Sequence, residues 1–210
     1  MNGPAALAFR HVRNVGTPMP RLEAVEKALG AAVYTDDMAL PGMLHGALLL
    51  SPHPHARIVS IDTARARAVP GVRAVVTGAD LPDRRVGMLI FDQFPLARDR
   101  VRYAGEPVAA VAADDIEIAR AATWLIDVRY EPIPAVFSID AALAPGAPVL
   151  HEAFEDYVKV MDMGPRASPN ELCCCRMVHG DVTAGFARSD LVLERTYETQ
   201  AQYHAYLEPA

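Results

Sequence analysis

The sequence lacks the features that mark several common classes of protein. No apolar run approaches the roughly 18 residues that a helix needs to span a bilayer. Lys and Arg number 20 against 26 Asp and Glu, and they form no cluster, so a nucleic-acid-binding face is not indicated. The first thirteen residues contain no continuous apolar stretch after a basic start. This argues against a secretory signal and makes the cytoplasm the expected location.

Loops that bind phosphate or present a nucleophile are also missing. The sequence contains neither a G-x-G-x-x-G pattern nor a Walker-type loop, which are the usual cradles for nucleotide phosphates. A G-x-S-x-G nucleophile elbow is likewise absent. The residues by themselves therefore suggest neither a nucleotide-binding enzyme nor a serine hydrolase.

Cysteine is scarce, and the three residues of this type are adjacent: Cys173, Cys174 and Cys175. Three neighbours cannot surround one metal tetrahedrally, because zinc and iron–sulfur sites use spacings such as C-x2-C. Adjacent cysteines also make strained disulfides. We therefore expect small, partly buried side chains in a reducing compartment, and no iron–sulfur cluster in this chain.

What is present is typical of a globular protein with both helices and strands. Of 210 residues, 51% are hydrophobic and 22% are charged, with a net charge of −6. This length allows one sizeable domain, or one domain and a fragment of another. Apolar segments alternate with turn signals, which indicates an α/β (α+β) fold. The elements expected in the first half are a helix over 21–29 ending at Gly30, a buried strand over 43–50, a strand over 57–61, a helix over 63–69 and a strand over 72–77.

A strand–helix–strand unit is expected over residues 107–131. Residues 107–113 are small and apolar, as in a strand buried on both faces. Asp114 and Asp115 follow, and their carboxylates are suited to capping the helix that begins there. The apolar face of this helix and the strand over 127–131 complete the unit.

The pattern divides the chain into four parts. Residues 1–20 are predicted to form an N-terminal arm, residues 21–136 a compact domain, residues 137–175 an extended proline-rich linker, and residues 176–210 the beginning of another domain. In the last part, Asp181 is expected to cap a helix over 182–187, and residues 191–197 read as a strand whose pattern persists to Tyr206. About thirty residues cannot build a core of their own.

Histidines and paired acids are the first candidates for chemistry, and each has a simpler explanation. His53 and His55 can pinch a metal from one side of a strand, but a site needs three or four ligands, so solvated side chains in a rigid turn are favoured. For His45 we expect a hydrogen-bonded place in the core. His204 has polar neighbours but no identifiable partner. Solvation in a turn accounts for the pair of acids at Asp36 and Asp37.

Several segments together resemble the a/b hammerhead domain of the xanthine dehydrogenase and aldehyde oxidase family of molybdenum hydroxylases. They are Leu40–Gly46, Ser51–Ile58, Ala68–Val72, Thr77–Asp80, Val101–Val111 and Val128–Val136. Farther on, Gly180–Val182 with Phe186–Ala187, and Tyr203–Pro209, are similar to the start of the first molybdenum-binding domain of the large subunit. The resemblance covers about residues 18–210. The order and spacing of these segments make it specific.

The resemblance implies an oxidoreductase that acts on an aromatic, heterocyclic or aldehyde-like carbon with oxygen derived from water. It implies molybdopterin as the cofactor, often as the cytosine dinucleotide, with [2Fe–2S] clusters and FAD on partner subunits. The family's cofactor loops and its general-base glutamate lie in more C-terminal regions, and Glu208 is not that base. No catalytic, cofactor-binding or metal-binding residue is therefore assigned to this chain, and Gly105-Glu106 is expected to shape a tight start to a strand.

The leading hypothesis is that this chain is an inactive N-terminal part of the large subunit, completed by a second polypeptide. Two further hypotheses stay open. The chain can be a non-catalytic structural or assembly module with a hammerhead fold. It can also be a fragment of a longer product.

Overall fold

The computed structural model describes residues 16, 18 and 21–202. Contacts divide the chain into two units, one of residues 42–196 and another formed by the residues before and after that range. In the second of these units the described residues form helix α1 (Ala24–Leu29) and the short 3-10 helix η1 (Thr35–Asp37). The predicted end of α1 at Gly30 is confirmed, since Gly30 has the left-handed φ of 69° that terminates helices.

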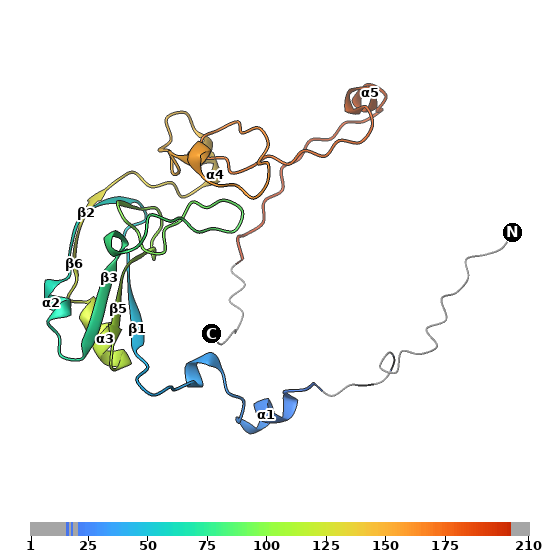
Figure 1. Ribbon diagram of the computed structural model, residues 1–210. Helices are drawn as coiled ribbons and strands as arrows, with labels where there is room; N and C mark the ends of the chain where they lie inside the picture. Colours follow the sequence, from blue (N-terminus) through green and yellow to red (C-terminus); the bar gives the residue numbers. More distant parts are fainter. Residues whose placement is uncertain (1–15, 17, 19–20, 203–210) are drawn as a thin grey trace. The chain divides into compact units, whose positions relative to one another are not determined.

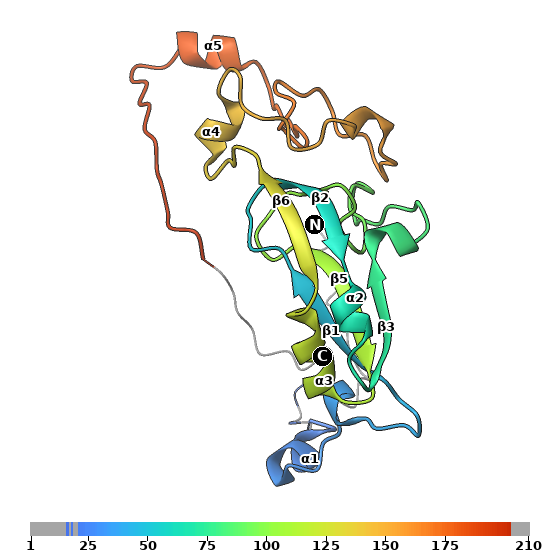
Figure 2. The same ribbon diagram turned by 90° about the vertical axis from the view of Figure 1, so that its left-hand side faces the viewer.

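Residues 42–196 contain two antiparallel sheets of three strands each (Figures 1 and 2). Sheet A has the order β1-β5-β3, and sheet B has the order β4-β2-β6. The α/β (α+β) class predicted from the sequence is confirmed, as are the strands predicted over 57–61, 72–77, 107–113 and 127–131. The strands are β1 (His45–Leu50), β2 (Ala56–Asp62), β3 (Val72–Thr77), β4 (Arg100–Val101), β5 (Pro107–Ala113) and β6 (Asp127–Pro132).

The main core forms where β5 meets two helices, α2 (Ala64–Arg67) and α3 (Ile116–Thr123). Alternate β5 residues Ala109, Val111 and Ala113 are buried there against Ala119 and Ala122 of α3. Four of these five residues are alanines, which lets the helix approach the sheet closely. This packing explains why the small apolar run of β5 occupies the central position of sheet A.

The predicted strand–helix–strand unit needs a correction in its topology. β5 lies in sheet A, whereas β6 pairs with β2 in sheet B. Helix α3 therefore connects two sheets instead of crossing over one. Periodicity identifies the elements, but pairing between strands that are distant in the sequence decides which sheet each one joins.

Only one of the two acids before α3 caps the helix. Asp115 is the N-cap, and its Oδ1 accepts hydrogen bonds from the backbone amides of Glu117 (2.7 Å) and Ile118 (3.4 Å). Asp114, also predicted as a cap, instead accepts two hydrogen bonds from Arg73.

The prediction of a buried strand over residues 43–50 is wrong, because β1 is an edge strand with alternating exposure.

The proline-rich residues 137–175 contain local structure. Helix α4 (Ile139–Leu143) is followed by the 3-10 helix η3 (Phe154–Asp156). A small apolar cluster joins Phe154, Tyr157 and Met163 to Ile90 from the loop between β3 and β4. The cysteines at 173–175 are free and exposed, contrary to the expected partial burial.

The last described residues fulfil one prediction and contradict another. Helix α5 (Val182–Ala187) has the predicted range, and Asp181 caps it by accepting a hydrogen bond of 2.9 Å from the Ala184 amide. Residues 191–197 do not form the predicted strand, and Leu191 is 72% exposed. Residues 203–206 of that pattern lie outside the described residues. No helix among the described residues is long and apolar enough to cross a membrane.

Candidate functional site

A group of charged side chains, including the buried Glu106, lines a cavity of about 100 Å³ near the start of β5. We call it the Glu106 cavity. Residues 92–106 form most of its wall, and His151 from the proline-rich segment closes it. Its charged or titratable lining residues are Asp92, Arg98, Asp99, Arg100, Arg102, Tyr103, Glu106 and His151.

Glu106 owes its position to a tight start of β5. The preceding residue, Gly105, has a φ of 92°, a left-handed conformation that favours glycine. Its amide donates to the Ser51 carbonyl at 2.8 Å, while the Ser51 amide donates to the Glu106 carbonyl at 2.9 Å. The predicted structural role of Gly105-Glu106 at the beginning of a strand is therefore confirmed.

The carboxylate of Glu106 is buried in this cavity. The residue is 8% exposed, and its Oε2 accepts a hydrogen bond of 2.5 Å from the Arg102 amide. Burial raises the pKa of the Glu106 carboxyl, because it removes water from the charged form. The hydrogen bond from the Arg102 amide and the charge of Arg102 oppose this rise in pKa without reversing it.

Three consecutive residues, Leu150, His151 and Glu152, are held by side chains from residues 92–102. Arg102 donates from Nε to the Leu150 carbonyl at 2.9 Å. Arg100 donates to Glu152 Oε1 at 3.2 and 3.3 Å. Between these contacts, His151 Nε2 lies 3.6 Å from Asp92 Oδ2. These contacts fasten the proline-rich segment to the wall of the cavity.

The His151 ring is held toward its neutral form. Burial lowers the pKa of His151, the Asp92 carboxylate opposes that effect, and the charges of Arg102 and Arg85 add to the lowering. A carboxylate beside a histidine usually raises the histidine pKa. Here the effects of burial and of two guanidinium groups on the His151 pKa outweigh the effect of the Asp92 carboxylate. At neutral pH the ring beside Asp92 is therefore uncharged.

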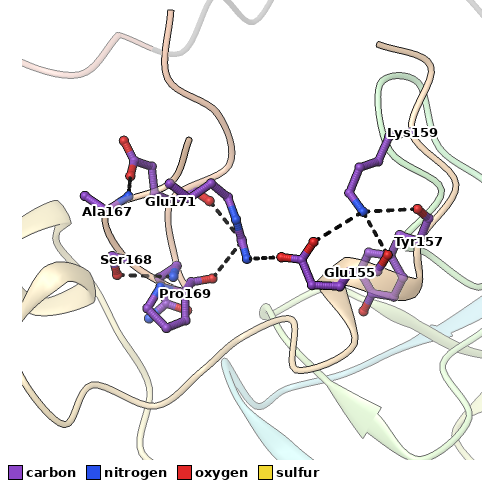
Figure 3. A network of polar contacts seen from close by, with 9 residues as sticks. Glu155, Tyr157, Lys159, Ala167, Ser168, Pro169 and Glu171 are labelled. Atoms are coloured by element: carbon purple, nitrogen blue, oxygen red, sulfur yellow. Dashed lines mark hydrogen bonds and ion pairs between the residues drawn. The ribbon is translucent and has the colours of Figure 1, made fainter. Parts of the chain in front are cut away.

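A second network stabilises the segment after η3 (Figure 3). Glu155 Oε1 accepts a hydrogen bond of 2.8 Å from Arg166, while Lys159 Nζ lies 3.9 Å from Glu155 Oε2. Arg166 also donates to the carbonyls of Pro169 and Glu171, both at 3.2 Å. Its guanidinium carbon lies 3.6 Å from the centre of the Phe154 ring. These contacts fix backbone positions within the segment, which is a structural role.

The histidines singled out by the sequence do not form a metal site in the described residues. His55 is 2% exposed and its Nδ1 lies 2.8 Å from the Pro134 carbonyl, so the expectation of a solvated ring is wrong. His53 packs edge-on against Tyr130, with ring centres 4.8 Å apart. His45 lies half-buried on edge strand β1, not in the core. Among the described residues no group of three or more His, Cys, Asp or Glu side chains is placed to hold a metal ion.

Other sequence candidates fall into simple roles or outside the described residues. Asp37 caps its own turn, since its Oδ2 accepts a hydrogen bond of 2.9 Å from the Tyr34 amide, and Asp36 beside it is exposed. His204 and Glu208 lie outside the described residues. The sequence did not draw attention to His151 or Asp92. The sequence does carry one signal for this cavity, which is the alternation of Arg98, Arg100 and Arg102. Residues two apart in an extended stretch face the same side, so this spacing brings several guanidinium groups together.

The model of a known domain family matches residues 29–134 of this chain: aldehyde oxidase and xanthine dehydrogenase, a/b hammerhead domain. A probable xanthine dehydrogenase subunit of Bacillus subtilis (strain 168) is 43% identical over 183 residues, covering 87% of this chain and 23% of that protein. The nicotinate dehydrogenase large molybdopterin subunit of Eubacterium barkeri is 32% identical over 196 residues, covering 93% of this chain and 43% of that protein.

Solved structures agree with this assignment. The reconstituted CO dehydrogenase from Oligotropha carboxidovorans is 40% identical, with a TM-score of 0.61, over 67% of this chain and 18% of the matched chain. The chain thus spans less than half the length of the relatives named here. The matched range 29–134 contains both sheets and helix α3. The chain therefore belongs to the aldehyde oxidase and xanthine dehydrogenase family, through its a/b hammerhead domain.

Proposed function

We propose that this chain is the N-terminal part of the large, molybdopterin-binding subunit of a xanthine dehydrogenase-type molybdenum hydroxylase. The complete enzyme oxidises an aromatic, heterocyclic or aldehyde-like carbon with oxygen derived from water. The observation that carries the proposal is the match of residues 29–134 to the hammerhead domain, in a chain that spans about a quarter of its Bacillus subtilis relative.

The proposed domain division follows the sequence pattern. Residues 1–20 are an arm, residues 21–136 the hammerhead domain, residues 137–175 a connection, and residues 176–210 the beginning of the cofactor-binding domain. The exposed apolar side chains between residues 191 and 197 support the last assignment, since a strand pattern without a partner strand fits an incomplete sheet.

The described residues do not form a site that fits the cofactor. The remainder of the subunit is proposed to bind it. They contain no grouped metal ligands, and the sequence has no glycine-rich phosphate loop. No chemical step on the cofactor, and no catalytic, cofactor-binding or metal-binding role, is therefore proposed for the residues of this chain. The chain by itself is inactive, and its role is to supply a folded domain and to contact the rest of the enzyme.

The proposed partners follow from the same assignment. They are a polypeptide with the remaining molybdopterin-binding domains, a small subunit with [2Fe–2S] clusters and a medium subunit with FAD, assembled in the cytoplasm. The molybdopterin is proposed to be the cytosine dinucleotide form. The name of the Eubacterium barkeri relative, a large molybdopterin subunit, supports the assignment of the cofactor to this kind of subunit.

Purification from the native cells tests the proposal. A tagged chain is isolated with its bound proteins, molybdenum is measured by mass spectrometry, and pterin is measured by fluorescence after oxidation. We expect both in the complex, together with substrate-dependent reduction of a dye, and neither in the chain expressed alone. Recovery of a stable complex without molybdenum and pterin would overturn the proposal in favour of the structural or assembly module. Detection of the tag only in a longer polypeptide that holds molybdenum would support it and identify the chain as a fragment.

A further inference from the structure

Within residues 42–196, sheet A has one face that is left open around Gly46. Strand pairing places Gly46, Ala112 and Ala74 in one row, and Leu48, Ala110 and Val76 in the next. Directly paired residues on antiparallel strands share a face. Their neighbours Leu49, Val111 and Val75 pack into the core beneath α3, so these six residues point to the opposite side. We call these six residues the open face.

The open face is apolar and has room above it. Leu48 is 54% exposed, and none of the six residues is charged. A Cβ atom placed on Gly46 would meet no heavy atom within 4 Å beyond its neighbours in the chain. An exposed, contiguous apolar surface on a sheet marks a contact site more often than a free surface.

The small side chains favour a closely packed occupant. Gly46, Ala74, Ala110 and Ala112 make a shallow floor, with Leu48 and Val76 rising from it. A sheet whose one face is covered by helices becomes part of a complete layered domain when a second layer covers the other face. Helices α2 and α3 supply the first layer, and no second layer lies over Gly46 among residues 42–196.

The occupant that fits is the remaining part of the same large subunit. This chain spans 23% of its Bacillus subtilis relative and 43% of its Eubacterium barkeri relative, so most of each relative lies outside the matched segment. A second copy of this chain fits less well, because each copy carries a net charge of −6 and two copies repel one another. We infer that the open face is the docking surface for an apolar element of the polypeptide that carries the rest of the large subunit. This inference rests on the proposed function.

Two substitutions and a matched control test the inference. Gly46→Leu places a bulky apolar group where this chain has free space, and a leucine suits a strand better than glycine. It therefore leaves the fold intact but obstructs a closely packed partner. Leu48→Lys puts a charge on the apolar face, at its β1 edge. Val59→Lys is the control, because Val59 is a similarly exposed apolar residue (49%) of β2 in sheet B.

The measurement is binding to the polypeptide from the same cells that carries the remaining large-subunit sequence. Circular dichroism first establishes that each variant melts like the original chain. We expect Gly46→Leu and Leu48→Lys to weaken binding at least tenfold and Val59→Lys to change it less than twofold. Unchanged binding by both face variants would overturn the inference and leave the proposed function standing. Failure of the original chain to bind would contradict both, and a homodimer abolished by Gly46→Leu would assign the face to a second copy instead.

Discussion

The Nε2 atom of His151 lies 3.6 Å from the Oδ2 atom of Asp92, yet the pKa of His151 is lowered. Burial and the charges of Arg102 and Arg85 outweigh the single carboxylate. Protonating His151 therefore costs free energy in the folded state. Because burial favours the neutral ring, protonation weakens the packing of residues 150–152 and makes their attachment sensitive to acid.

Acid is expected to weaken the fold through His151. A histidine whose folded pKa is lowered contributes stability above its unfolded pKa of about 6.5, and that stability is lost as the pH falls through the folded pKa. His151→Gln removes this titration. Urea unfolding followed by circular dichroism should show a steeper loss of stability below pH 6.5 for the original chain than for the variant. Parallel pH profiles for the two proteins would contradict the assignment.

Glu106 is expected to have the opposite pH dependence. Because its pKa is raised in the folded state, its contribution is fully present below its unfolded pKa and is lost as the pH rises through the folded pKa. Glu106→Gln removes the buried charge and keeps an oxygen that can accept the Arg102 amide. At pH 7 this variant should be at least as stable as the original chain, with the difference shrinking toward pH 4.

Glu106→Ala is the control for the hydrogen bond. It removes the charge and the acceptor together, which leaves the amide of the partly buried Arg102 unpaired at a cost of up to about 1–3 kcal/mol. We expect Glu106→Ala to be less stable than Glu106→Gln at every pH between 4 and 8. Equal stability of the two variants would show that the carboxylate does not hold the Arg102 backbone.

The two acids before α3 have different roles, since Asp115 is a helix cap and Asp114 belongs to a surface ion pair. Asp115 caps two amides, and Asp115→Ala should lower the free energy of unfolding by about 1 kcal/mol. Asp114 and Arg73 are exposed at the surface, where ion pairs contribute little. Asp114→Ala should therefore cost less than Asp115→Ala, and its effect should shrink further in 0.5 M salt. A larger loss for Asp114→Ala, measured by urea unfolding, would reverse the assigned roles.

Elements whose limits are set by local interactions lie where the sequence predicts them. The limits of β3 follow from the Pro70-Gly71 turn before it, and those of α5 follow from the Asp181 cap. Both elements are where the sequence predicted them. Residues 191–197 have an equally clear strand pattern but pair with no strand of the described part of the chain, because pattern alone supplies no backbone hydrogen-bond partner.

The contacts around the Glu106 cavity are of the nonlocal kind. His151 lies far along the chain from Asp92 in a segment that reads as a linker, and its proximity follows from the path of the loops. The burial of Glu106 likewise depends on which segments cover the start of β5. Periodicity and capping residues carry no information on either point. The family resemblance, in contrast, rests on the order and spacing of several segments, and it anticipated the hammerhead domain.

Two glycines provide the sharpest test of local packing. A Cβ atom on Gly87 would lie 1.7 Å from the Ile90 carbonyl oxygen, so Gly87→Ala forces the backbone of the loop that carries Ile90 to move. Ile90 contributes to the small apolar cluster with Phe154 and Tyr157, and we expect a loss of about 1–3 kcal/mol in stability. Gly46→Ala is the matched control, since open space surrounds that position and the substitution should leave thermal unfolding unchanged. Limited proteolysis should then show faster cleavage between residues 83 and 95 in Gly87→Ala alone. Equal melting temperatures and cleavage rates for the two variants would contradict the close approach of Gly87 to Ile90.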